Sequence, residues 1–211
     1  MTIKQFIFSP FQENTYVIST EDKLAMILDP GCFSADEENK LQSYIESEGL
    51  EVVHLVNTHL HLDHIFGNSF VEKTWNVLTE ACIGDVNVLE NYESHCSRFG
   101  ITPPSKAPTI GIILKEGDRI QLGNDFFDIY EVPGHSPGSI ILHHAAEGHL
   151  FVGDVLFKGS IGRTDLEDGN YEQLIQGIQK KILVLPDETI VYSGHGPTTT
   201  IGNERANNPF L

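Results

Sequence analysis

Three histidines and one aspartate lie within six residues of each other, directly after an apolar segment of the chain. The apolar segment covers residues 52–56 and leads into the sequence Thr58-His59-Leu60-His61-Leu62-Asp63-His64. Imidazole nitrogens and carboxylate oxygens are both metal ligands, and a hydrophobic core does not require so many polar groups directly after a buried strand. The pattern therefore predicts a metal site. The alternative is a histidine-rich loop whose side chains hydrogen-bond to solvent.

The spacing of these residues indicates how ions would share them. Side chains two residues apart in an extended segment point the same way, so His59 and His61 can converge on one ion. A turn at Leu62 would bring Asp63 and His64 round to another ion. We therefore expect two adjacent ions.

Three further candidate ligands follow later predicted strands, each in a short loop with neighbouring glycines. The loops are Pro133-Gly134-His135-Ser136-Pro137-Gly138, Val152-Gly153-Asp154-Val155 and Ser193-Gly194-His195-Gly196-Pro197. Glycines let backbone segments approach closely, and loops at strand ends often carry function. A single histidine is more often structural than a ligand, but the three motifs together favour His135, Asp154 and His195 as ligands.

The H-x-H-x-D-H sequence at residues 59–64 resembles the signature of the metallo-β-lactamase superfamily, and the later motifs extend the resemblance over nearly the whole chain. The combination is similar to the hydroxyacylglutathione hydrolases, or type II glyoxalases, and in particular to their short single-domain forms in bacteria. Zinc is the metal expected, with iron and manganese as alternatives, because all three bind histidine and carboxylate. The resemblance implies that His59, His61 and His135 hold one metal, that Asp63, His64 and His195 hold a second, and that Asp154 bridges the two.

The resemblance also implies a reaction. Two adjacent divalent ions lower the pKa of a shared water and polarise a carbonyl group, so a metal-bridging hydroxide would attack a small acyl thioester such as S-lactoylglutathione. Asp63 and Asp154 are the expected catalytic carboxylates around that hydroxide. A lactonase or esterase of the same fold, a mononuclear iron persulfide dioxygenase and a non-catalytic binding module are the alternatives. A dizinc β-lactamase is disfavoured, because those enzymes place a cysteine where Asp154 stands.

Two more residues receive roles from the resemblance. Arg163 corresponds to a basic residue that contacts glutathione in full-length glyoxalases, and its alternative role is an ion pair with Asp165. Asp29 is expected to support the ligand histidines or else to cap its own loop. Full-length glyoxalases also carry a C-terminal helical domain, and a tyrosine where this chain has Pro197, so we expect weak recognition of glutathione.

Apolar periodicity and turn residues predict the elements that would position this site. An α/β four-layer αββα sandwich, with two mixed sheets and outer helices in one domain over residues 1–211, satisfies their order and is the fold that the resemblance implies. Residues 101–110 are predicted as a loop that rims the active-site mouth, and a polar segment follows residue 192. The predicted helices cover residues 35–48, 65–74, 80–98 and 171–183, and the predicted strands cover residues 3–8, 15–19, 24–28, 51–57, 76–78, 112–114, 119–122, 126–132, 139–144, 149–152 and 189–192.

Composition limits the partners of the chain. Its formal net charge is −17 with only 13 lysines and arginines, so no nucleic-acid surface is expected. Three cysteines without a C-x-x-C spacing favour free thiols. The sequence has neither a signal-peptide pattern nor a membrane-spanning apolar run, so we expect a cytoplasmic protein that acts on a small acyl thioester or ester, with its oligomeric state left open. The remaining histidines, His54, His95, His143, His144 and His149, are predicted to be structural or on the surface.

Overall fold

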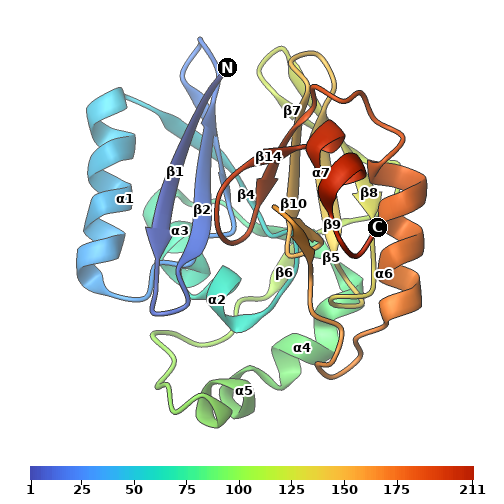
Figure 1. The fold of residues 1–211 in the computed structure, drawn as a ribbon. Coiled ribbons are helices and arrows are strands. Elements are labelled where there is room, and N and C mark those ends of the chain that lie inside the picture. The colour runs from blue at the N-terminus through green and yellow to red at the C-terminus, as the bar shows by residue number, and fades with distance from the viewer.

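Two six-stranded β-sheets face each other, and helices cover the outer face of each sheet (Figure 1). The computed structural model describes all 211 residues. The first sheet has the order β1-β2-β3-β4-β5-β6 and the second β14-β13-β10-β9-β8-β7. Both sheets are mixed: β3, β4, β5 and β6 pair in parallel in the first sheet, where β1, β2 and β3 pair antiparallel, and β10 is parallel to β13 but antiparallel to β9 in the second. The predicted four-layer αββα sandwich is therefore confirmed.

The strands and helices have the following bounds. The first sheet contains β1 (Thr2–Phe8), β2 (Glu13–Ser19), β3 (Leu24–Leu28), β4 (Glu51–Val56), β5 (Thr79–Cys82) and β6 (Ile110–Leu114). The second contains β7 (Arg119–Leu122), β8 (Asp125–Glu131), β9 (Ile140–His144), β10 (His149–Gly153), β13 (Ile190–Ser193) and β14 (Thr199–Thr200), and a separate hairpin contains β11 (Leu156–Phe157) and β12 (Ser160–Ile161).

Helices α1 (Ala35–Glu48) and α3 (Asn68–Trp75) pack on the first sheet. Helix α6 (Tyr171–Gly177), its π-helical continuation Ile178–Ile182 and α7 (Ile201–Asn207) pack on the second. The short helices are α2 (Leu62–Ile65), a 3₁₀ turn at Ile83–Asp85, α4 (Val86–Glu90) and α5 (Tyr92–Arg98), and the last two lie at the lower end of the view in Figure 1. None of the helices is both long enough and apolar enough to span a lipid bilayer.

Alternating side chains divide the apolar residues between the layers. In β3, Met26 and Leu28 point between the sheets, whereas Ala25 and Ile27 face the helical layer of α1 and α3. Because both faces of the inner strands are covered, such strands are apolar along almost their whole length. The residues buried between the sheets, which we call the inter-sheet cluster, are Tyr16, Ile18, Met26, Leu28, Val56, Cys82, Leu114, Ile120, Leu122, Phe127, Ile129, Ile140, Leu142 and Phe151.

Helix α1 has the predicted bounds because its sequence carries a signal at each end. Ser34 and Glu37 form a capping box at its start, where each side chain accepts a hydrogen bond from the backbone N–H of the other residue. Gly49 ends the helix in the left-handed region at φ 62°, which glycine adopts without strain. Leu41 and Ile45 form the buried face.

The predictions for residues 76–98 are only partly correct. The strand expected at residues 76–78 lies instead at β5, and the helix expected at 80–98 is replaced by β5, a 3₁₀ turn, α4 and α5. The start of β5 is polar but buried, because Thr79 Oγ1 donates to Glu72 Oε1 at 2.7 Å and Glu80 Oε1 lies 2.6 Å from His54 Nδ1. Side chains distant in sequence therefore stabilise a strand that local apolar spacing does not reveal.

Two other regions also depart from the prediction. The helix predicted at residues 65–74 is divided at Gly67, whose N–H donates to Pro30 O at 2.7 Å. The chain turns at this glycine between α2 and α3. A side chain at Gly67 would collide with Cys32 Sγ, so only glycine allows the close approach of the two segments. The polar segment after residue 192 contains β14 and α7, and Thr200 caps α7 by accepting from the Asn203 N–H.

The neighbouring residues Phe126 and Phe127 of β8 allow the inter-sheet cluster to be tested with one type of substitution. Phe127 is fully buried in the cluster, whereas Phe126 is 44% exposed and lies near the Arg119 guanidinium. We expect Phe127→Ala to lower the free energy of unfolding by about 3–5 kcal/mol, because it leaves a cavity, and Phe126→Ala by about 1 kcal/mol. Urea denaturation measures both values, and equal losses would contradict the assignment of the cluster as the main core.

Candidate metal centre

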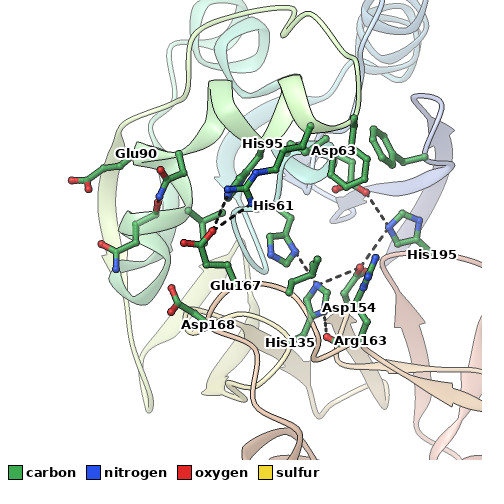
Figure 2. Close-up of a pocket in the computed structure, with 18 residues that line it drawn as sticks. His61, Asp63, Glu90, His95, His135, Asp154, Arg163, Glu167, Asp168 and His195 are labelled. Carbon is green, nitrogen blue, oxygen red and sulfur yellow. Dashed lines mark hydrogen bonds and ion pairs between the residues drawn. The ribbon is translucent and has the colours of Figure 1, made fainter.

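The structure brings all seven predicted ligand side chains together where strands of both sheets end. His59 and His61 follow β4, and Asp63 and His64 lie in α2 immediately afterwards. The other three, His135, Asp154 and His195, follow β8, β10 and β13 of the second sheet. Figure 2 shows His61, Asp63, His135, Asp154 and His195 pointing toward one another.

The first group of candidate ligands consists of His59, His61 and His135, whose ligand atoms all lie within 4.8 Å of one another. His61 Nδ1 is 2.9 Å from His135 Nε2. His59 is 1% exposed and His135 is 2% exposed, so this group is shielded from bulk water. His135 is held from behind, because its Nδ1 lies 2.9 Å from the backbone oxygen of Arg163, which leaves Nε2 directed into the group.

The second group consists of Asp63, His64 and His195, and its ligand atoms also lie within 4.8 Å of one another. His195 Nε2 is 3.2 Å from Asp63 Oδ2. Asp154 lies between the two groups: its Oδ1 is 3.5 Å from His64 Nε2, and its Oδ2 is 3.6 Å from both His135 Nε2 and His195 Nε2. Donor atoms around a tetrahedral ion with bonds of about 2.1 Å are about 3.4 Å apart, so these separations fit metal ligands.

Several buried polar atoms at this point have no hydrogen-bond partner within the protein. They include His59 Nε2, His64 Nε2 and Asp154 Oδ1. A buried polar atom without a partner costs about 1–3 kcal/mol, and such atoms are rare in folded proteins. Ions bound among them would satisfy all three, so the residues present fit a metal.

The charges of the centre also favour bound cations. Burial and the neighbouring His135 lower the pKa of His61 to about 3, which keeps its imidazole neutral and able to bind a metal. Burial opposes protonation of His64, but the carboxylates of Asp154 and Asp63 outweigh it and raise its pKa well above the usual value. The centre therefore attracts positive charge, which divalent ions would supply.

Asp29 lies directly behind the histidines. Its Oδ1 accepts from the Thr58 N–H at 2.7 Å and its Oδ2 from the Thr58 hydroxyl at 2.6 Å, and Oδ2 is 3.1 Å from His64 Nδ1. The same hydroxyl is 3.1 Å from His59 Nδ1. These contacts correspond to the predicted role of supporting ligand histidines, and they reach well beyond the loop of Asp29 itself.

Asp85 is a residue that the sequence analysis missed. It is fully buried, and its carboxylate accepts hydrogen bonds from the N–H groups of Leu60 and Gly138 and from the Ser136 hydroxyl. Burial raises its pKa, although these hydrogen bonds oppose the effect. Leu60 lies between His59 and His61, and Ser136 follows His135, so one carboxylate joins the two loops that carry the first ligand group. No local motif marks this aspartate.

Strand β2 positions the loop that carries His195. The Asn14 side chain donates to Ser193 O at 2.9 Å and to Gly196 O at 2.8 Å, and the Tyr16 hydroxyl donates to Ser193 O at 2.7 Å. A side chain at Gly194 would collide with Asp154 and His64, so only glycine allows this close approach. The first sheet therefore holds a loop of the second.

A cavity of about 660 Å³ opens beside the centre and contains Asp63, Asp154 and His195 in its wall. The predicted rim loop at residues 101–110 does not line it, because α4, α5 and the segment after β12 occupy its sides. His95, predicted to be structural or on the surface, lines it. The further lining residues are Phe11, His61, Leu62, Asn87, Val88, Glu90, Asn91, Arg98, Phe99, His135, Arg163, Leu166, Glu167 and Asp168.

Arg163 forms the ion pair with Asp165 that was its alternative role. Its Nε and Nη2 atoms each lie 2.8 Å from a different oxygen of the Asp165 carboxylate. This pair raises the pKa of Arg163 and lowers the pKa of Asp165 to about 2. Arg163 also lines the cavity, so its contact with a substrate stays a prediction.

Asp85→Asn tests whether this carboxylate positions the first ligand group. The change replaces one acceptor oxygen with a donor, so at least one of the three hydrogen bonds is lost. We expect the free energy of unfolding to fall by about 1–3 kcal/mol and the affinity for zinc to fall by about 10–100-fold. Urea denaturation and zinc titration against a competing chelator measure the two effects.

Asp118→Asn is the matched control, because Asp118 also accepts from a backbone N–H, that of Lys115 at 3.0 Å, in the turn between β6 and β7. This variant should bind zinc as the unchanged protein does. A zinc affinity that is equal in the Asp85→Asn variant and the unchanged protein would contradict the positioning role.

The chain resembles known proteins along almost its whole length. Residues 8–195 match the Metallo-beta-lactamase superfamily. The chain is 36% identical to the hydroxyacylglutathione hydrolase GloC of Haemophilus influenzae, over 100% of this chain and 98% of that protein. Among solved structures it is similar to the BLEG-1 B3 metallo-beta-lactamase, with 38% identity, a TM-score of 0.91 and coverage of 100% and 99% of the two chains. It is also similar to TTHA1623 in a di-iron-bound form, with 32% identity, a TM-score of 0.88 and coverage of 99% and 100%. The chain therefore belongs to the metallo-β-lactamase superfamily and is a metallo-hydrolase of that superfamily.

Proposed function

We propose that this metallo-hydrolase is a dinuclear thioesterase that cleaves small acyl thioesters, in the manner of a type II glyoxalase. The position of Asp154 is the observation that carries the proposal. Its carboxylate lies between the two groups of three candidate ligands: Oδ2 is 3.6 Å from His135 of the first group and from His195 of the second, and Oδ1, which has no hydrogen-bond partner, is 3.5 Å from His64 of the second. In the proposed centre one ion is held by His59, His61 and His135, the other by Asp63, His64 and His195, and both by Asp154.

Two adjacent divalent ions, when bound, lower the pKa of a water held between them and polarise the carbonyl oxygen of a substrate. The buried imidazoles of His59 and His64 hold their nitrogens away from bulk water, supported by Asp29. Candidate ligands of both groups border the cavity, among them His61, Asp63 and His195, so the substrate would approach the centre through this cavity. The carboxylates of Asp63 and Asp154 orient the centre and balance its charge.

The cavity wall favours water as the nucleophile. Its lining contains no serine, threonine, cysteine, lysine or tyrosine side chain that could attack a carbonyl group. A thiolate leaving group needs little protonation, because a free thiol has a pKa near 8.5, whereas the amine expelled from an amide must gain a proton. This difference supports thioesters over amides as substrates.

The proposal also covers the identity of the metal, the domain organisation and the cellular compartment. Zinc is the metal we expect, and the similarity to a di-iron-bound protein supports iron as the alternative. We propose that residues 1–211 act as one domain on a small-molecule substrate in the cytoplasm.

Asp154→Ala tests the shared ligand. We expect the unchanged protein to contain about two divalent ions per chain, and the variant to bind metal more weakly at both positions, because each position would lose one of its four protein ligands. Elemental analysis of the purified proteins measures this, and treatment with a chelator should abolish thioesterase activity until zinc is restored.

Asp165→Ala is the control for that experiment, since Asp165 is an exposed carboxylate that pairs with Arg163 and faces neither ligand group. It should keep both ions. Two ions per chain at near-full occupancy in the Asp154→Ala variant would rule out the bridging role.

Steady-state kinetics test which substrate the enzyme cleaves and whether Arg163 helps to bind it. We expect measurable hydrolysis of S-lactoylglutathione with a high KM, because the Arg163 guanidinium that would bind its carboxylates is engaged by Asp165. Arg163→Ala should raise KM by about two- to fivefold, as loss of an exposed ion pair of roughly 0.5–1 kcal/mol would do, and change kcat less. An unchanged KM would mean that Arg163 does not contact the substrate and serves only in its ion pair with Asp165.

Cleavage of a lactone or a β-lactam, or oxygen consumption with a persulfide, in place of thioester hydrolysis would contradict the proposed function.

A further inference from the structure

Every arginine that lines the cavity is already paired with a carboxylate. Arg163 forms the two-point contact with Asp165 described above. Arg98 Nη1 lies 3.6 Å from Glu167 Oε2. The same oxygen is 3.7 Å from His95 Nε2 (Figure 2). Both arginines of the lining therefore already have a carboxylate partner within the protein.

Glu167 connects two sides of the cavity. It belongs to the segment after β12, whereas His95 and Arg98 lie on α5. Glu90 and Asp168 add two more carboxylates to the lining, and neither forms an ion pair. A substrate anion in this part of the cavity would have to displace Glu167 from its partners and would meet two further carboxylates of the same sign.

The rest of the lining suits an uncharged chain. Phe11 and Phe99 pack edge to face at 5.5 Å between ring centres, and Leu62 and Leu166 also line the cavity. The formal net charge of −17 adds a long-range field that repels anions and attracts cations. Charge and apolar surface therefore both disfavour an anionic ligand.

We propose that the outer part of the cavity takes thioesters whose thiol moiety is neutral or cationic, that it disfavours anionic thiol moieties, and that Glu167 determines this selectivity. The inference rests on the proposed thioesterase function and names the substrate class of the same site. Glu167 acts by occupying His95 and Arg98, and it does not take part in the hydrolysis.

Three acetyl thioesters that differ in the charge of the thiol moiety test the proposal with the metal-loaded enzyme. They are acetylthiocholine, which is cationic, S-acetyl-N-acetylcysteamine, which is neutral, and S-acetyl-3-mercaptopropionate, which is anionic. A thiol reagent measures release of the thiol. We expect kcat/KM for the anionic thioester to be at least about tenfold below that for the neutral one, with a smaller difference at high salt because screening weakens repulsion.

Glu167→Gln should release His95 and Arg98. We expect it to raise kcat/KM for the anionic thioester by about three- to tenfold and to leave the neutral thioester within about twofold. Glu90→Gln is the matched control, because it removes one negative charge from the same lining without releasing a cation, and its effect should be smaller. A double variant that carries both Glu167→Gln and Arg98→Gln should lose most of the gain in kcat/KM for the anionic thioester.

The outcomes separate the inference from the proposed function. Hydrolysis of all three thioesters with equal kcat/KM, and no response to Glu167→Gln, would overturn the inference while the thioesterase assignment stands. An equal gain in Glu167→Gln and Glu90→Gln would also overturn it, because the effect would then come from the general change in charge and not from the release of Arg98 on α5. Failure to cleave any thioester would overturn the proposed function and the inference with it.

Discussion

The packing of the two sheets against each other is the constraint on which the candidate metal centre depends. Its ligand side chains follow β4, β8, β10 and β13, so they belong to loops of both sheets. Metal ligands must lie within a few tenths of an ångström of their ideal positions, which loops alone do not achieve. The inter-sheet cluster provides that precision, because close-packed side chains cannot shift without losing contacts. The reacting groups are therefore placed by a hydrophobic core that they do not belong to.

Buried carboxylates orient the ligand-bearing loops that apolar packing brings close together. Asp29 accepts two hydrogen bonds from Thr58 and lies beside His64, and Asp85 accepts three from the loops that flank the first ligand group. A buried charge is costly unless it is fully paired, and both residues meet that condition with several donors. Hydrogen bonds have direction whereas apolar contacts do not, so these carboxylates orient the loops that the sheets bring near each other.

The centre and its cavity are built from different parts of the chain and carry different parts of the function. The candidate ligands sit at strand ends and in α2, which are tied into the core by buried hydrogen bonds. The cavity walls come from α4, α5 and the segment after β12, where the contacts are exposed ion pairs such as that of Arg98 with Glu167. The proposed reaction thus depends on the buried part, and the proposed substrate choice depends on exposed elements around the cavity.

The sequence by itself determined the features that depend on neighbouring residues. Local motifs identified the seven candidate ligands, and the helical spacing of apolar residues identified α1. Only the tertiary structure decided the features that depend on distant partners. Polar β5 is a strand because Glu72 and His54 pair with it, and Asp85 reaches residues 25, 51 and 53 positions away. The roles of His95 and Glu167 in the cavity likewise arise from contact between segments far apart in the chain. Hydrogen bonds and ion pairs of this kind have no periodicity in the sequence, because their partners are brought together only when the sheets pack.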